Sequence, residues 1–68
     1  MKKKDDALYI VTVYDGEKNK TIELCRNTSY YKVSSLFDAL MGYCKPECIV
    51  IMYEFKEGIT SIIKKGIT

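Results

Sequence analysis

The sequence predicts a small α+β domain of order ββαββ, in which a four-stranded, mostly antiparallel sheet carries one helix on one face. Two segments, 7–13 (ALYIVTV) and 48–53 (CIVIMY), are apolar at nearly every position, which is typical of strands that are covered on both faces. Each is followed, after a polar turn, by a more amphipathic segment. Between the two pairs lies a single stretch with apolar residues at helical spacing.

The first hairpin is expected near the N-terminus. Residues 8–14 are rich in β-branched and aromatic side chains, and residues 21–26 alternate, with Ile22 and Leu24 on one side. Between them, residues 15–20 (DGEKNK) are polar and include Asp-Gly and Asn, which tolerate positive φ in a turn. The loop length is ambiguous between about two and five residues. Because a shift of one residue exchanges the faces of a strand, the sequence leaves the register open.

The helix is predicted after the polar break that follows the second strand. Apolar residues recur there at spacings of three and four, at Tyr30, Val33, Leu36, Phe37, Leu40, Met41 and Cys44. We expect Ser34 or Ser35 to cap its start, because Ser35 and Asp38 have the spacing of a capping box. Gly42 is a candidate C-cap, and Pro46 prevents the helix from continuing.

A second hairpin is predicted from residues 48–55 and 59–64, which are joined by a turn at 56–58 (KEG). Strands that are apolar on both faces are usually central, so the first and third strands are expected in the middle, in the spatial order 2-1-3-4. Residues 1–6 (MKKKDD) are charged and without pattern. We expect them to form a mobile arm before a single domain over residues 7–68.

One helix covers only one face, so the central strands are predicted to leave an apolar surface on the other. We assign to that helix-free face alternate positions of the central strands and one position of the last strand: Tyr9, Val11, Val13, Val50, Met52 and Ile62. An apolar surface of this kind usually marks an interface. Self-association into a homodimer is the favoured cover, and the alternatives are a larger target protein or a sheet that curls into a partial barrel.

The composition argues against most catalytic chemistry. The chain has no histidine, its acidic residues fall in turns or on polar strand positions, and no glycine-rich phosphate loop is present. We therefore expect that the protein is not an enzyme and binds no cofactor. The three cysteines, Cys25, Cys44 and Cys48, lack the fourth ligand of a structural zinc site, so we also expect no metal. Their odd number, without a signal peptide or an apolar span, predicts a reduced cytoplasmic protein with no membrane segment.

Eleven basic and nine acidic residues give a net charge of +2, which neither demands nor excludes nucleic acid. Aromatic side chains among lysines can stack the bases of single strands, so single-stranded nucleic-acid binding is the alternative function. Its candidate residues are Tyr9, Tyr14, Tyr53, Lys18, Lys20 and Lys56. The predicted function is a non-catalytic protein-binding module, such as a small inhibitor or adaptor. A phage or mobile-element origin is suggested only by analogy with other small domains.

Overall fold

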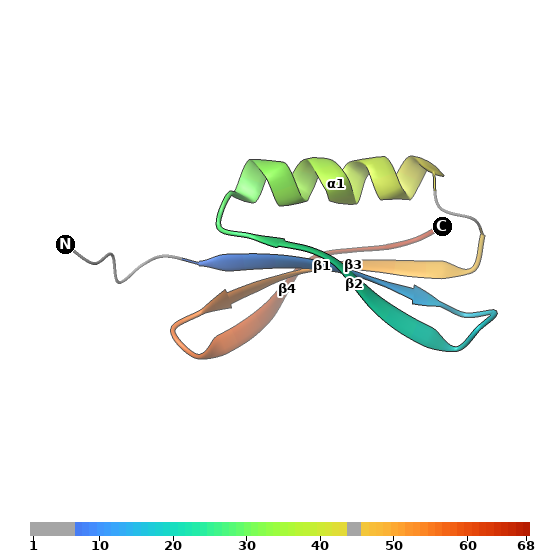
Figure 1. The fold of residues 1–68 in the computed structure, drawn as a ribbon, viewed down its shortest axis with the longest axis horizontal. Helices are drawn as coiled ribbons and strands as arrows, with labels where there is room; N and C mark the ends of the chain where they lie inside the picture. Colours follow the sequence, from blue (N-terminus) through green and yellow to red (C-terminus); the bar gives the residue numbers. More distant parts are fainter. Residues whose placement is uncertain (1–6, 44–45) are drawn as a thin grey trace.

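The computed structural model describes residues 7–43 and 46–68, and within them the element order is ββαββ, as predicted. Two hairpins are joined by one helix, α1 (Tyr30–Tyr43) (Figure 1). The strands are β1 (Leu8–Asp15), β2 (Lys20–Asn27), β3 (Cys48–Lys56) and β4 (Ile59–Ile67). The arm predicted at residues 1–6 lies outside the described residues.

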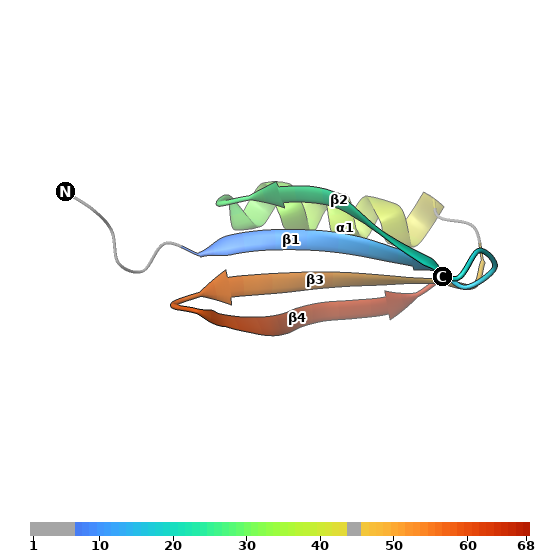
Figure 2. The same cartoon turned by 60° about the horizontal axis from the view of Figure 1, so that its bottom comes forward.

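The strands form a single antiparallel sheet in the order β2-β1-β3-β4, which confirms the predicted arrangement (Figure 2). The helix lies across one face of this sheet and leaves the other face without a helix (Figure 1). In the described part of the chain β2 and β4 are the outer strands and do not pair with each other. The sheet therefore twists but remains open, and it does not close into a barrel.

The core lies between α1 and the sheet. Val11 of β1 is the register partner of Met52 of β3, and both side chains are fully buried. Together with Val50 they pack against Val33 and Phe37 of the helix. Because side chains alternate across a strand, even-numbered residues of β1 and odd-numbered residues of β3 lie on the opposite face. This opposite face is named the helix-free face below.

The two hairpins use different turns, which resolves the loop length that the sequence left open. In the second hairpin, Glu57 and Gly58 have φ values of 53° and 79°, as in the two-residue turns that match the twist of paired strands. The first hairpin has a longer loop over residues 16–19, where Asn19 has a φ of 56°. There the carboxylate of Asp15 accepts hydrogen bonds from two following backbone N–H groups, at 2.9 Å and 3.3 Å. Asp15 thus holds the loop in place as an Asx turn does.

Each outer strand contains one extra residue, Leu24 in β2 and Ile63 in β4. Both bulges interrupt the pairing beside the buried pair of β1 and β3, so they lie at the same level of the sheet. The bulge also breaks the alternation of β2. Ile22 and Cys25, three positions apart, therefore both lie on the helix side.

The helix begins one turn earlier than the capping pattern predicts, so the assignment of Ser34 or Ser35 as the cap is wrong. Ser29 is the cap: its Oγ accepts a hydrogen bond from the N–H of Lys32 at 3.4 Å, and its carbonyl accepts one from Val33 at 3.3 Å. Ser34 is buried and Ser35 is exposed, both within the helix. Ser34 instead has a tertiary partner on β4, which local spacing does not reveal.

Two element ends also differ from the prediction. The helix continues to Tyr43, so Gly42 lies inside its last turn and is not the C-cap. Cys44, assigned to the apolar side of the helix, lies outside the described residues. β4 runs to Ile67, beyond the predicted end at residue 64, because the chain keeps pairing with β3 after the bulge.

Candidate protein interface

The helix-free face is apolar along both central strands. Its apolar residues are Leu8 and Ile10 of β1, Ile49, Ile51, Tyr53 and Phe55 of β3, and Ile62 and Ile67 of β4. The other residues of β1 and β3 in this set are half-buried by their neighbours, whereas Phe55, Ile62 and Ile67 are 43%, 57% and 69% exposed. The predicted excess of apolar strand surface is therefore present, and the helix does not cover it.

The sequence assigned the wrong set of residues to this face. Of the predicted interface residues, Ile62 alone lies on the helix-free face, as the partner of Tyr53. Val11, Val50 and Met52 are fully buried beneath the helix, and Tyr9 and Val13 pack against the same core. The error is a shift of one residue along each central strand. Because both faces of these strands are apolar, their pattern does not indicate which face the helix covers.

Tyr9 shows how fully the helix side is occupied. Its ring meets the ring of Tyr30 edge to face, with centroids 5.4 Å apart and planes at 86°. Its hydroxyl donates a hydrogen bond to Glu54 of β3 at 3.4 Å. Tyr9 is therefore part of the contact between helix and sheet and is not available for docking.

The structure does not bring the candidate nucleic-acid residues together. Tyr9 lies on the helix side, whereas Tyr14 and Tyr53 lie on the helix-free face. Lys18 and Lys20 belong to the end of the sheet at the first turn, and Lys56 lies at the opposite end, beside the second turn. The tyrosines and lysines therefore form no continuous track along which a strand could stack.

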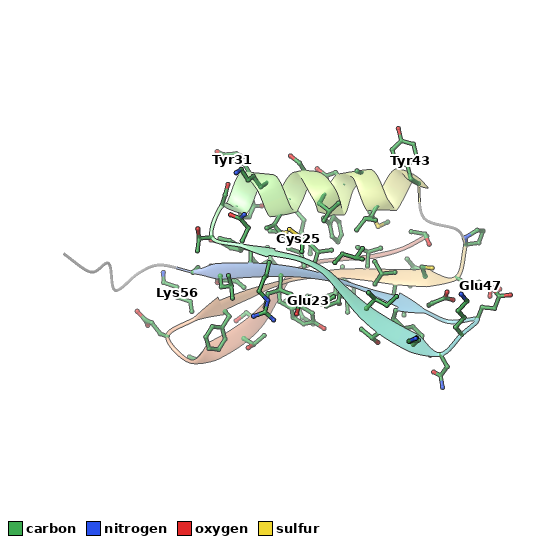
Figure 3. All side chains as sticks on the ribbon, in the orientation of Figure 1. Glu23, Cys25, Tyr31, Tyr43, Glu47 and Lys56 are labelled. Atoms are coloured by element: carbon green, nitrogen blue, oxygen red, sulfur yellow. The ribbon has the colours of Figure 1, made fainter. Side chains whose placement is uncertain are left out.

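Charged side chains flank the apolar residues on the helix-free face. Glu23 of β2 is the partner of Thr12, and Figure 3 shows it on the side of the sheet opposite Cys25. The guanidinium of Arg26 donates two hydrogen bonds to the Glu23 carboxylate, each at 2.7 Å. These hydrogen bonds, with the attraction between the charges, lower the pKa of Glu23 and raise the pKa of Arg26. Sequence reasoning missed this pair, because residues three apart share a strand face only across a bulge.

Lys64 of β4 makes a second set of contacts that the sequence analysis missed, between the helix and the edge of the sheet. Lys64 of β4 lies on the helix side, and its ammonium donates a hydrogen bond to Ser34 at 2.6 Å. The same nitrogen lies 3.7 Å from the carboxylate of Asp38 and 5.5 Å and 5.9 Å from the ring centroids of Phe37 and Tyr30. These contacts belong to the packing of the helix on the sheet, so Lys64 stabilises the fold.

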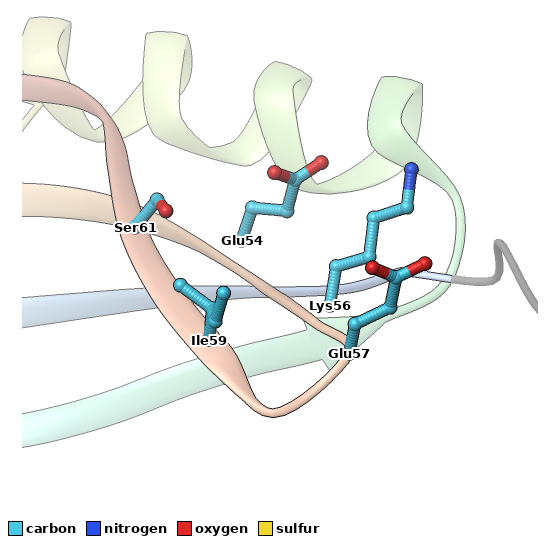
Figure 4. A pocket seen from close by; sticks show the side chains of 5 residues that line it. All are labelled: Glu54, Lys56, Glu57, Ile59 and Ser61. Carbon is cyan, nitrogen blue, oxygen red and sulfur yellow. The ribbon is translucent and has the colours of Figure 1, made fainter.

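A shallow depression of about 280 Å³ lies on the helix side of the second hairpin (Figure 4). Its lining residues are Glu54, Lys56, Glu57, Ile59 and Ser61. The depression is open to solvent and mostly polar, unlike the enclosed apolar pockets that hold small molecules. It therefore offers no defined ligand site.

The two described cysteines lie apart in the sheet. Cys25 of β2 is half-buried opposite Val11, and Cys48, at the start of β3, is buried opposite Asp15; both are free thiols. Within residues 7–43 and 46–68 no three potential ligands gather into a metal site. The described residues also contain no helix with the length and apolarity needed to cross a membrane.

Comparisons with protein-family models, with curated proteins and with solved structures found no match for this chain. The coordinates themselves define its class, a four-stranded antiparallel α+β domain with one helix-covered face and one apolar helix-free face. The function must therefore be inferred from that second face.

Proposed function

We propose that this protein is a non-catalytic binding domain that docks onto another protein surface through its helix-free face. The observation that carries the proposal is the apolar surface along β1 and β3, which no element of the described residues covers. Contiguous apolar surface of this kind on a small domain is characteristic of interaction sites. A domain that offers such a face acts by occupying its partner, as an inhibitor or an adaptor does.

The energy available from covering this face supports the proposal. Full burial of a large apolar side chain contributes about 1.5–3 kcal/mol, and the inner residues here are already half-covered. Enclosing the remaining surface would yield on the order of 5–10 kcal/mol before the cost of association. That is comparable to the whole stability of a small domain, so a partner would contribute as much as the fold itself.

A lysine at the centre of the helix-free face tests the proposal. Ile51 is the partner of Thr12 in the middle of β3, and its side chain faces away from the helix. Ile51→Lys places a charge where the proposed contact excludes water, so the variant is expected to remain folded and to lose its protein complexes. Comparative affinity capture of tagged wild type and variant, followed by sedimentation velocity on the purified proteins, measures the loss.

The matched control is Tyr31→Lys, on the outer side of the helix, where the side chain is 82% exposed. It adds the same charge and should keep every complex of the wild type. Val50→Lys, one residue before the test position, buries the charge in the core and should unfold the domain by circular dichroism. The proposal is overturned if folded Ile51→Lys retains the same complexes as Tyr31→Lys.

A further inference from the structure

Two side chains of opposite charge, Glu23 and Lys65, lie at the two edges of the helix-free face. One row of register partners crosses all four strands in the order Glu23, Thr12, Ile51 and Lys65. Glu23 is thus at the β2 edge and Lys65 at the β4 edge of the same row. Lys65 has no ion-pair partner within the described part of the chain. A row with Glu23 at one edge and Lys65 at the other is complementary to its own copy after a two-fold rotation.

We infer that the occupant of the helix-free face is a second copy of this chain, packed face to face about a two-fold axis parallel to the central strands. This rotation lays β2 of one copy over β4 of the other. Lys65 of each copy then lies opposite Glu23 of the other, and the symmetry generates this contact twice. The inference rests on the proposed function, which by itself requires only that the face binds protein.

The twist of the sheets is compatible with this pairing. Two sheets pack with their strands at about 30° to each other. Neighbouring strands lie about 4.8 Å apart, so an outer strand is about 7 Å from the middle of the sheet and the angle displaces facing edge positions by about 4 Å. The flexible four-carbon stem of Lys65 spans such a displacement.

The area of the face is also sufficient. Strands of eight or nine residues, four abreast, present a face of about 500 Å². Two copies would therefore enclose about 1,000 Å², which is the lower bound for a specific protein interface. A second copy covers the face from edge to edge, including the exposed Ile62 and Ile67 of β4.

The internal pair of Glu23 and Arg26 leaves room for the new contact. Arg26 takes one hydrogen-bonding position on each carboxylate oxygen of Glu23, and each oxygen has a further lone pair. The ammonium of Lys65 from the other copy can occupy one of these. The result is a three-membered network at each end of the interface, with Glu23 between two cations.

A two-fold axis across the strands is the competing arrangement. It would lay each outer strand over its own copy, placing Glu23 near Arg26 of the other copy and Lys65 near Ile62. Lys65 would then lose water against an apolar side chain without gaining a charge partner. The arrangement parallel to the strands avoids this cost.

Reversal of the two charges separates these possibilities. Sedimentation equilibrium should show that wild type is a dimer and that E23K and K65E each dissociate about tenfold or more readily, because each change creates two repulsions. Mixed in equal amounts, E23K and K65E should form a heterodimer of wild-type affinity, and the double variant E23K/K65E should regain its own dimer. Lys20→Glu is the control: it changes net charge as K65E does, but it lies in a row on the helix side and should leave the dimer intact.

The outcomes bear on different claims. If the two single variants show no preference for each other while wild type is a dimer, the inferred register is wrong. If wild type is a monomer at every concentration, a second copy is not the occupant. The proposed function is then still tested by whether Ile51→Lys loses a foreign partner protein. K65E alters no internal pair of the described residues, so it decides the outcome even if E23K fails to fold.

Discussion

At the residue scale, the pairing of Glu23 with Arg26 depends on a single inserted residue. Side chains three apart on a regular strand point to opposite faces. Here the bulge at Leu24 lies between them, so Glu23 and Arg26 share the helix-free face and meet at 2.7 Å. The same insertion places Glu23 and Arg26 together at the β2 edge of the helix-free face.

The pair gives a prediction for acid titration. Hydrogen bonds from Arg26 lower the folded-state pKa of Glu23 below its ordinary value of 4.5. The pair therefore stabilises the fold fully above that ordinary pKa, and the contribution is lost as the pH falls through the lower folded-state pKa. Titration of the Glu23 carboxyl carbon by NMR should give a midpoint below 4.5 in wild type and one closer to 4.5 in Arg26→Gln. An equal midpoint in the two proteins would contradict the assignment.

At the scale of elements, the start of the helix depends on Ser29. The side chain of Asn27 accepts a hydrogen bond from the N–H of Ser29 at 2.8 Å, and Ser29 in turn caps the first turn of the helix. No acidic residue in that turn offers a second source of stabilisation. The chain thus leaves β2 and enters the helix through two consecutive side-chain hydrogen bonds.

Removal of this cap should therefore be costly. Ser29→Ala is expected to lower the free energy of unfolding by about 0.5–2 kcal/mol, because the N–H of Lys32 in the first turn loses its side-chain acceptor. Ser35→Ala is the matched control, since Ser35 is exposed inside the helix and alanine is the better helix former. Urea unfolding of the two variants measures the difference. Equal stability would mean that Ser29 does not act as the cap.

The order and pairing of the elements were predictable from the sequence, whereas their faces were not. The two-faced apolar runs that became β1 and β3 indicated central strands, and the predicted order 2-1-3-4 is confirmed. The same runs did not indicate which face meets the helix. Val50, which was expected on the helix-free face, is buried beneath the helix, and Ile51 lies on the helix-free face instead. Other features depend on tertiary packing and are not indicated by any local sequence pattern. These are the bulges at Leu24 and Ile63 and the contacts of Lys64.

At the scale of the whole molecule, the helix covers one face of the sheet and the proposed partner would cover the other. The helix side contains the fully buried residues, and the helix-free face contributes to stability in proportion to how much of it is enclosed. A second copy that binds only the folded chain shifts the folding equilibrium by mass action. Folding and association are then linked.

This linkage predicts a melting temperature that depends on protein concentration. A tenfold increase in concentration adds about 1.4 kcal/mol to the stability of a dimer, which corresponds to a rise of a few degrees for a domain of this size. Scanning calorimetry over a hundredfold range of concentration should show this rise for wild type. Ile51→Lys should melt at one temperature throughout. A wild-type melting temperature that does not change with concentration would show that association and folding are not linked.

The two bulges affect whether further strands can add to the edges of this sheet. Long, regular outer strands serve as templates on which further strands add without limit, which is the route to fibrils. In β2 and β4 the regular spacing of backbone groups is interrupted halfway, at Leu24 and Ile63. Lateral addition of strands is therefore hindered at both edges of the sheet, and the proposed pairing through the helix-free face would end at two copies.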